Sequence, residues 1–107
     1  MERKTLKLAD VAKPETNEKS LAMRGLPFRV KLDEIKEFFA EVCEVPEDNI
    51  HIEEDNGRRS GAGLVVFENE DQAQEVKDAL NRKEIGGRFI QLFDQNDRMW
   101  EQLVQSA

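Results

Sequence analysis

The sequence predicts an α+β fold in which two helices cover one face of a four-stranded antiparallel sheet. Three observations support this prediction. Four stretches alternate like strands or consist of strand-forming residues, at 20–24, 49–54, 61–67 and 88–93. Two stretches, 32–42 and 69–80, carry apolar residues at the three- and four-residue spacing of a helix. The resulting order, βαββαβ, is the ferredoxin-like arrangement of a split βαβ unit.

The first strand shows how each strand is bounded. Leu21 and Met23 alternate with Ala22 and Arg24, and Gly25 and Pro27 end the strand. The second strand has two inward isoleucines, the third follows the turn at 56–60, and the fourth follows a double-glycine turn. The residues that support these three assignments are Ile50, Ile52, Asn56, Gly57, Gly86 and Gly87.

Each predicted helix has one apolar side. In the first helix this stripe is Leu32, Ile35, Phe38, Phe39 and Val42. The second helix begins at Asn69 or Glu70, and its stripe is Ala73, Val76, Ala79 and Leu80. Residues 94–105 can form a third helix, and its apolar side is Met99, Trp100, Leu103 and Val104.

The length and the composition of the chain indicate one globular domain. The chain has 107 residues and 38% hydrophobic residues, with six Phe and one Trp. We expect a disordered leader over 1–19, a folded domain over 20–93, and a C-terminal helix within 94–107 that packs on the sheet. The formal net charge of −7 argues against non-specific binding to duplex nucleic acid, but it leaves room for a local basic site on a single strand.

The sequence lacks the parts of an enzyme. His51 is the only histidine, and it has no cluster of cysteines or histidines around it. The acidic run 53–55 lies near a turn and is typical of a solvated loop. We therefore predict no catalytic residue, no metal site and no cofactor. The single cysteine, Cys43, fits a reducing compartment, and no stretch has the length of a membrane span.

One stretch carries the signature of a known fold. The octamer K/R-G-F/Y-G/A-F-V-x-F/Y aligns with residues 60–67, where Gly61, Gly63, Val65 and Phe67 match. Ala62 and Leu64 stand where the two base-stacking aromatic residues belong. The stretch therefore resembles an RNA-recognition motif whose stacking surface has been removed.

Three further stretches, and a fourth after the last strand, narrow the resemblance to one group of these motifs. Arg24-Gly-Leu-Pro-Phe28 is similar to the R-G-L-P-W exit from the first strand of the quasi-RNA-recognition motifs of heterogeneous nuclear ribonucleoproteins F and H. Residues 57–61 resemble the G-R-x-S-G turn of that family, and residues 85–89 resemble its G-x-R-Y turn. The stretch 98–100 resembles its E-M-x-W tail, with the Trp shifted by one residue.

This resemblance implies a site on the loops rather than on the sheet. The quasi-motifs bind single-stranded, G-rich RNA through arginines and aromatic residues at the ends of their strands. Phe stands at position 28 for the family's Trp and at position 89 for its Tyr, so both rings remain. The predicted RNA-binding residues are Arg24, Phe28, Arg58, Arg59, Arg88 and Phe89. The resemblance also implies a role in pre-mRNA splicing or mRNA regulation, in the nucleus, the cytoplasm or both.

Each of these residues has a structural alternative. Arg58 and Arg59 can be solvated loop residues, and Arg24 can pair with Glu53. Phe28 can fill the core under the first helix instead of facing solvent. Trp100 can cover the apolar patch on the outer sheet face or stack on RNA.

Two other functions remain open at this stage. The first helix is acidic, with Asp33, Glu34, Glu37 and Glu41, and can serve a protein partner. Domains of the U2AF-homology type use such a helix with an R-x-F turn, but residues 88–89 lack the intervening residue. Homodimerisation through the outer sheet face is the other option. We expect a monomer with single-stranded RNA as its main partner.

Overall fold

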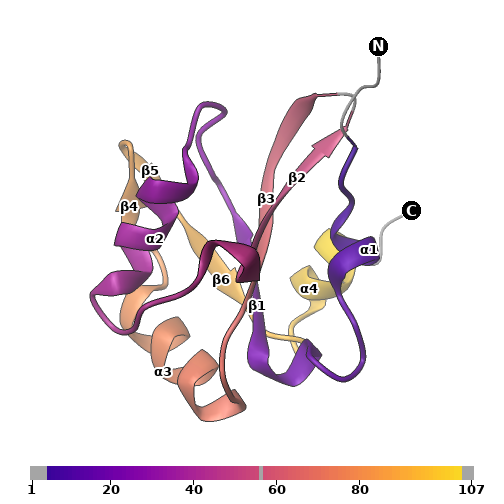
Figure 1. The fold of residues 1–107 in the computed structure, drawn as a ribbon, viewed down its shortest axis with the longest axis vertical. Helices are drawn as coiled ribbons and strands as arrows, with labels where there is room; N and C mark the ends of the chain where they lie inside the picture. Colours follow the sequence, from indigo (N-terminus) through magenta and orange to yellow (C-terminus); the bar gives the residue numbers. More distant parts are fainter. Residues whose placement is uncertain (1–4, 56, 105–107) are drawn as a thin grey trace.

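The predicted α+β architecture is confirmed by the computed structural model, which describes residues 5–55 and 57–104. Four strands form an antiparallel sheet in the order β2-β3-β1-β6. They are β1 (Ser20–Arg24), β2 (Ile50–Asp55), β3 (Arg58–Val66) and β6 (Gln91–Phe93). Helices α2 (Leu32–Ala40) and α3 (Glu70–Leu80) cover one face, and α1 (Leu8–Val11) and α4 (Arg98–Val104) lie on the other (Figure 1).

The main core lies between the sheet and the helices α2 and α3. Alternate residues of β1, Leu21 and Met23, are fully buried there, as the alternation of strand side chains requires. The ring of Phe39 in α2 meets the ring of Phe67, with centroids 5.6 Å apart. In α3 the buried residues are Ala73, Val76 and Leu80, whereas Ala79, predicted as part of the stripe, is exposed.

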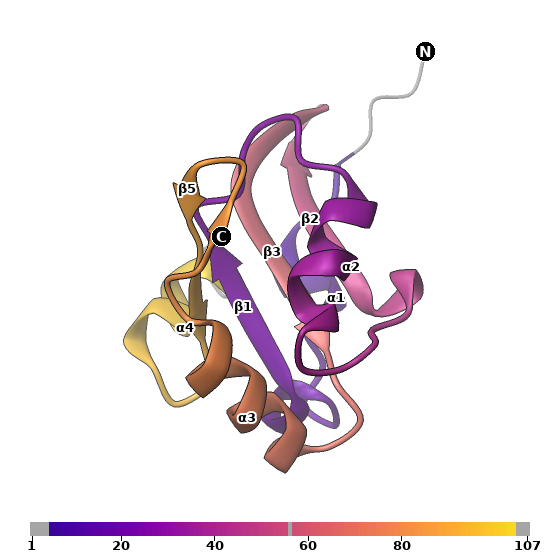
Figure 2. The ribbon, with the colours of Figure 1, turned by 90° about the vertical axis from the view of Figure 1, so that its left-hand side faces the viewer.

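The fourth strand differs from the prediction. We expected one strand over 88–93, but Ile90 divides it into β5 (Arg88–Phe89) and β6. β5 pairs with β4 (Glu84–Ile85) in a separate hairpin, and β6 pairs with β1. The cause is the turn at Gly86 and Gly87, which both have positive φ and close a tight hairpin. The hairpin stands beside the end of the main sheet (Figure 2).

A second apolar cluster lies on the outer face of the sheet. Ala22 of β1 and Leu64 of β3 lie under Trp100 of α4 and Leu8 of α1. Phe93 packs against this cluster, whereas Val66 does not belong to it. Trp100 is only 2% exposed, so the alternative in which it stacks on RNA is not the one seen.

The prediction of a disordered leader over 1–19 is wrong for its described part, residues 5–19. The backbone of Leu6 pairs with Glu54 at the edge of β2, and the N–H of Leu8 donates to a Glu53 carboxylate oxygen at 3.1 Å. The 3-10 helix η1 (Asn17–Lys19) then leads into β1. Outside the leader, a second 3-10 helix, η2 (Glu47–Asn49), leads into β2 in the same way. Residues 5–19 are thus held by contacts with the edge and the outer face of the sheet. Residues 1–4 and 105–107 lie outside the described residues.

Asp94 stabilises residues 94–97, the segment that connects β6 to α4. Its carboxylate accepts hydrogen bonds from Lys77 at 2.8 Å, Gln74 at 3.1 Å and the N–H of Asn96 at 2.9 Å. Burial alone raises the pKa of Asp94, but these donors outweigh it and leave the pKa lowered. The ionised carboxylate therefore stabilises the fold at neutral pH, and this stabilisation is lost as the pH falls through the lowered pKa.

Across 5–55 and 57–104, no helix has both the length and the apolar character that crossing a bilayer requires. Within the same residues, no three His, Cys, Asp or Glu side chains gather where they could hold a metal ion.

Candidate nucleic-acid interface

Three loops that are distant in sequence meet at one end of the sheet. The β1–α2 loop, residues 25–31, is at the centre of this meeting. The N–H of Leu26 donates to the carbonyl of Gly61 in β3 at 2.9 Å. A Cβ atom at Gly25 would lie 2.5 Å from the carbonyl oxygen of Phe89, and one at Gly86 would lie 3.4 Å from Pro27. The loop therefore contacts both the β2–β3 hairpin and the β4–β5 hairpin.

Arg59 holds this loop in place. Its Nη1 donates to the carbonyl oxygen of Val30 and, at 3.3 Å, to that of Phe28. Its Nε pairs with Glu54 at 3.3 Å, and its side chain is 28% exposed. Since its Nε and Nη1 donate to groups within the protein, the structure gives Arg59 a positioning role.

Two aromatic rings project from the loops into solvent. Phe28 is 68% exposed and Phe89 is 66% exposed, and they are the two large apolar side chains that the described residues leave exposed. The alternative in which Phe28 fills the core is not seen, because its loop neighbours Leu26 and Val30 occupy that space and are buried. Exposed rings of this kind offer a stacking face to an unpaired base.

Three arginines at the same end have free guanidinium groups. Arg24 ends β1 between Ala62 and Gln91, Arg58 begins β3 at the hairpin, and Arg88 begins β5. All three are exposed, and none belongs to an ion pair found among the described residues. The predicted alternative for Arg24, a bond to Glu53, is not seen. The Glu53 carboxylate instead accepts from Leu8 and from Ser60, the latter at 2.8 Å.

Arg82 is a candidate that the sequence did not indicate. With Phe89 and Gln91, it lines a hollow of about 430 Å³. Its backbone has φ of 72°, and its N–H donates to the carbonyl of Ile90 at 2.8 Å. This turn brings the planar guanidinium group of Arg82 into the same hollow as the exposed ring of Phe89. No sequence motif indicates this position, because a non-glycine residue with positive φ is uncommon.

The outer sheet face is closed to a nucleic acid in this structure. Ala62 and Leu64, which replace the two stacking aromatic residues, are 4% and 0% exposed. They lie in the cluster beneath Leu8 and Trp100. The exposed rings of Phe28 and Phe89 thus lie on the loops and not on this face of the sheet.

Gly25 provides a test of this arrangement. We expect Gly87→Ala to cost about 1–3 kcal/mol of unfolding free energy, because φ is +83° there but a Cβ atom meets nothing within 4 Å. Gly25→Ala also requires an unfavourable φ, of +95°, and drives its Cβ into the Phe89 carbonyl. It should therefore cost about 1–3 kcal/mol more than the control. Urea denaturation measures both, and equal costs would contradict the close approach of the two loops.

Comparisons with known proteins agree with this fold. The sequence pattern of the RNA recognition motif family matches residues 21–91. Glycine-rich RNA-binding protein 3, mitochondrial, of Arabidopsis thaliana is 27% identical to the chain over 78 residues. That match covers 73% of the chain but 25% of the relative, so the chain spans about a quarter of that protein's length.

Solved structures give the same result. The Glorund qRRM2 domain is 28% identical with a TM-score of 0.62, and the match covers 79% of this chain and 97% of that domain. The second RNA recognition motif of RNA-binding protein 19 is 31% identical with a TM-score of 0.60, covering 71% and 80%. The human G-rich RNA sequence binding factor 1 shares the fold, with 24% identity and a TM-score of 0.63 over 78% of this chain and 86% of that one.

Proposed function

The chain belongs to the RNA recognition motif family, and on that premise we propose that it binds single-stranded RNA through its loops. The family is an RNA-binding module and generally not enzymatic. The proposed site, which we name the loop surface, consists of Arg24, Phe28, Arg58, Arg82, Arg88 and Phe89. The observation that carries the proposal is the pair of exposed rings, Phe28 and Phe89, beside free arginines, while the usual stacking positions are buried.

The chemistry of the loop surface suits an unpaired strand. A base that stacks on an aromatic ring gains about 1–3 kcal/mol. An arginine can stack on a base through its planar guanidinium, or donate two hydrogen bonds to a phosphate or to O6 and N7 of guanine. Arg59 contributes indirectly in this proposal, because it fixes the carbonyl of Phe28 and thereby orients the loop.

We further propose that this domain prefers G-rich RNA, as the quasi-RNA-recognition motifs do. This preference is supported by the R-G-L-P-F, G-R-R-S-G and G-G-R-F pieces, which now lie together at one end of the sheet, and by the similarity to the Glorund qRRM2 domain. Pre-mRNA splicing or mRNA regulation, in the nucleus or the cytoplasm, and a monomeric state belong to the same proposal. They are supported by the family resemblance alone.

Amide-shift NMR with short G-rich, U-rich and A-rich oligonucleotides tests the proposal. The largest shifts should fall at 24–29, 57–60 and 82–89, and G-rich RNA should bind most tightly. Arg58→Ala should weaken binding by about 1–3 kcal/mol if the guanidinium contacts a base, or lower the salt slope by about one unit if it contacts phosphate. Arg58→Lys keeps the charge but loses the planar guanidinium. It should therefore weaken binding markedly if Arg58 contacts a base, and only slightly if Arg58 contacts phosphate.

The control is an arginine away from the loop surface. Arg98 is exposed in α4, and Arg98→Ala removes the same charge at another place. The proposal is wrong if Arg98→Ala weakens RNA binding as much as Arg58→Ala does. It is also wrong if the largest shifts fall at Ala62, Leu64 and Gln91 in the middle of the sheet.

A further inference from the structure

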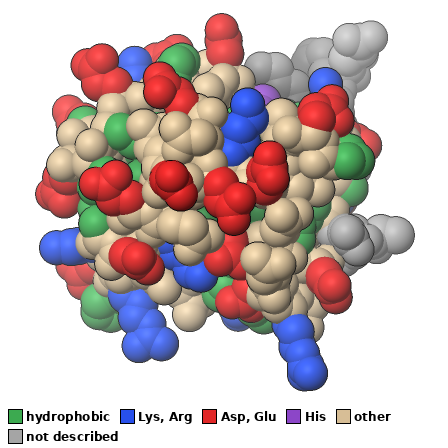
Figure 3. Space-filling view, turned by 90° about the horizontal axis from the view of Figure 1, so that it is seen from below, with side chains coloured by type: hydrophobic (Ala, Val, Ile, Leu, Met, Phe, Trp, Pro, Cys, Tyr) green, Lys and Arg blue, Asp and Glu red, His purple; other side chains and the backbone are tan. Residues whose placement is uncertain are grey.

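The charges of the chain are strongly segregated. The helical layer, residues 32–49 and 68–80, holds twelve of the 23 acidic residues but two of the 16 Lys and Arg, a net charge of −10. The remaining residues hold eleven acidic residues and fourteen Lys and Arg, a net of +3. The face seen from below in Figure 1 is crowded with acidic side chains (Figure 3). The helical layer therefore repels RNA and attracts cationic groups.

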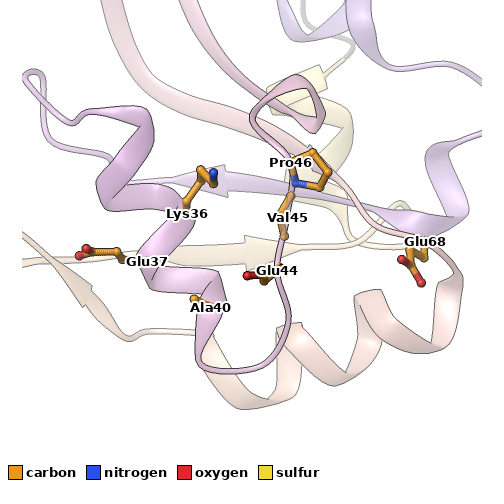
Figure 4. A pocket seen from close by; sticks show the side chains of 7 residues that line it. All are labelled: Lys36, Glu37, Ala40, Glu44, Val45, Pro46 and Glu68. Atoms are coloured by element: carbon orange, nitrogen blue, oxygen red, sulfur yellow. The ribbon is translucent and has the colours of Figure 1, made fainter.

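A hollow of about 550 Å³ lies in this acidic layer, between α2 and the loop that follows it. Its apolar part is Ala40, Val45 and Pro46, and three glutamates surround it: Glu37, Glu44 and Glu68. Figure 4 shows Ala40 on α2 across from Glu44 and Val45 on the loop, with Glu68 on the following segment. Its volume is within the ~300–1,000 Å³ of small-ligand pockets.

The glutamates of this hollow have no internal cation partner. The ion pairs found among the described residues include none of the three, although Lys36 also lines the hollow. Glu37 extends toward the other side of α2, where it lines a second hollow of about 320 Å³ with Glu34 and Glu41. Near Glu68, burial and then the charges of Glu75 and Glu68 raise the pKa of the Cys43 thiol. With three glutamates and one lysine, the lining of the hollow has a net negative charge.

We propose that the hollow beside α2 binds a basic peptide segment of a partner protein. One apolar side chain of the peptide enters the space over Ala40, Val45 and Pro46, and lysines or arginines on either side of it pair with Glu37, Glu44 and Glu68. Charge complementarity selects this occupant, because an acidic rim disfavours nucleic acid and acidic peptides alike. This proposal goes beyond RNA binding and does not depend on it.

The hollow and the loop surface can be occupied together. β3 begins at Arg58, in the loop surface, and ends at Val66, two residues before Glu68. A strand of this length spans roughly 27 Å at the usual rise per residue. A peptide at the hollow therefore leaves the RNA site accessible, and a failure of one proposal is distinguishable from a failure of the other.

Fluorescence anisotropy with a labelled peptide, Arg-Lys-Arg-Leu-Arg-Lys-Arg, tests the proposal on the whole chain. The triple variant Glu37→Gln, Glu44→Gln, Glu68→Gln should weaken binding about tenfold, because three charge contacts are lost. A matched control, Glu15→Gln, Glu18→Gln, Glu101→Gln, makes the same change in net charge at exposed positions elsewhere and should change affinity less than about twofold. Amide shifts should fall at 36–46 and near Glu68.

A second pair of variants tests the hollow without changing charge. Ala40 and Ala79 are both exposed on helices, but Ala40 lines the hollow. Ala40→Phe should fill the space and weaken peptide binding, whereas Ala79→Phe should not. The proposal is overturned if both triple variants weaken binding equally. It is also overturned if a peptide with Ser in place of Leu binds as tightly, since diffuse attraction then accounts for the binding.

Discussion

Replacing Trp100 with Ala should lower the unfolding free energy by about 3–5 kcal/mol. The ring is 2% exposed and packs with Leu64 and Leu8, so its removal leaves a cavity between the sheet and both terminal helices. We also expect the loss to expose the outer face of the sheet to solvent. Urea denaturation followed by far-UV circular dichroism measures the change, because the variant has no Trp left for fluorescence.

Phe89→Ala is the matched control for this experiment. Phe89 is also a large aromatic residue, but it is 66% exposed, and its removal should change stability by no more than about 0.5 kcal/mol. If Trp100→Ala costs less than about 1 kcal/mol, α4 does not dock on the sheet in solution. The sheet face would then be available to RNA, and loop binding would need to be reconsidered.

Truncating the two exposed rings should have the largest effect on RNA binding. Phe28→Ala and Phe89→Ala should each weaken binding of a G-rich oligonucleotide by about 1–3 kcal/mol, the value of one stacked base. Stability should hardly change, because neither ring contributes to the core. Isothermal titration calorimetry measures the affinity, and the dispersion of amide signals verifies the fold.

Leucine variants separate stacking from simple apolar contact. Phe28→Leu and Phe89→Leu keep most of the apolar bulk but lose the flat face, so they should bind almost as weakly as the alanine variants. If the double alanine variant binds RNA with unchanged affinity, the loop surface is not the RNA site. Amide shifts at Ala22 or Leu64 would then indicate that RNA displaces α4 from the sheet.

Sequence periodicity predicted the central part of the fold because that part depends on local patterns. The strands β1 to β3 and the helices α2, α3 and α4 all overlap the ranges predicted for them, but β3 begins at Arg58, three residues before the predicted start at residue 61, so Arg58 and Arg59 belong to the strand and not to the loop. The order of residues 5–19 could not be predicted in the same way. Leu8 begins a helix of only four residues and is buried against the sheet, and the backbone at Leu6 and Leu8 bonds to Glu54 and Glu53 of β2. The order of this segment therefore depends on tertiary contacts.

The candidate site was predictable in part. Turn motifs and family resemblance identified the exposed rings and arginines, and the structure brings their loops together. The positioning role of Arg59 could not be predicted, because its acceptors are backbone carbonyls 29 and 31 residues away in sequence. Arg82 was missed because its position depends on a backbone conformation that the sequence does not reveal.

The segregation of charge has a further consequence for how the protein meets RNA. A net of −10 on the helical layer and +3 elsewhere makes the domain an electric dipole, although its total charge is negative. As the domain diffuses toward a polyanion, the electric field of the polyanion exerts a torque on it. This torque turns the acidic helical layer away from the nucleic acid and turns the basic residues toward it. Within a Debye length, about 8 Å at physiological salt, the acidic helical layer is therefore the side least favoured to meet the nucleic acid, and contact through the rest of the surface, which carries the net +3, is favoured.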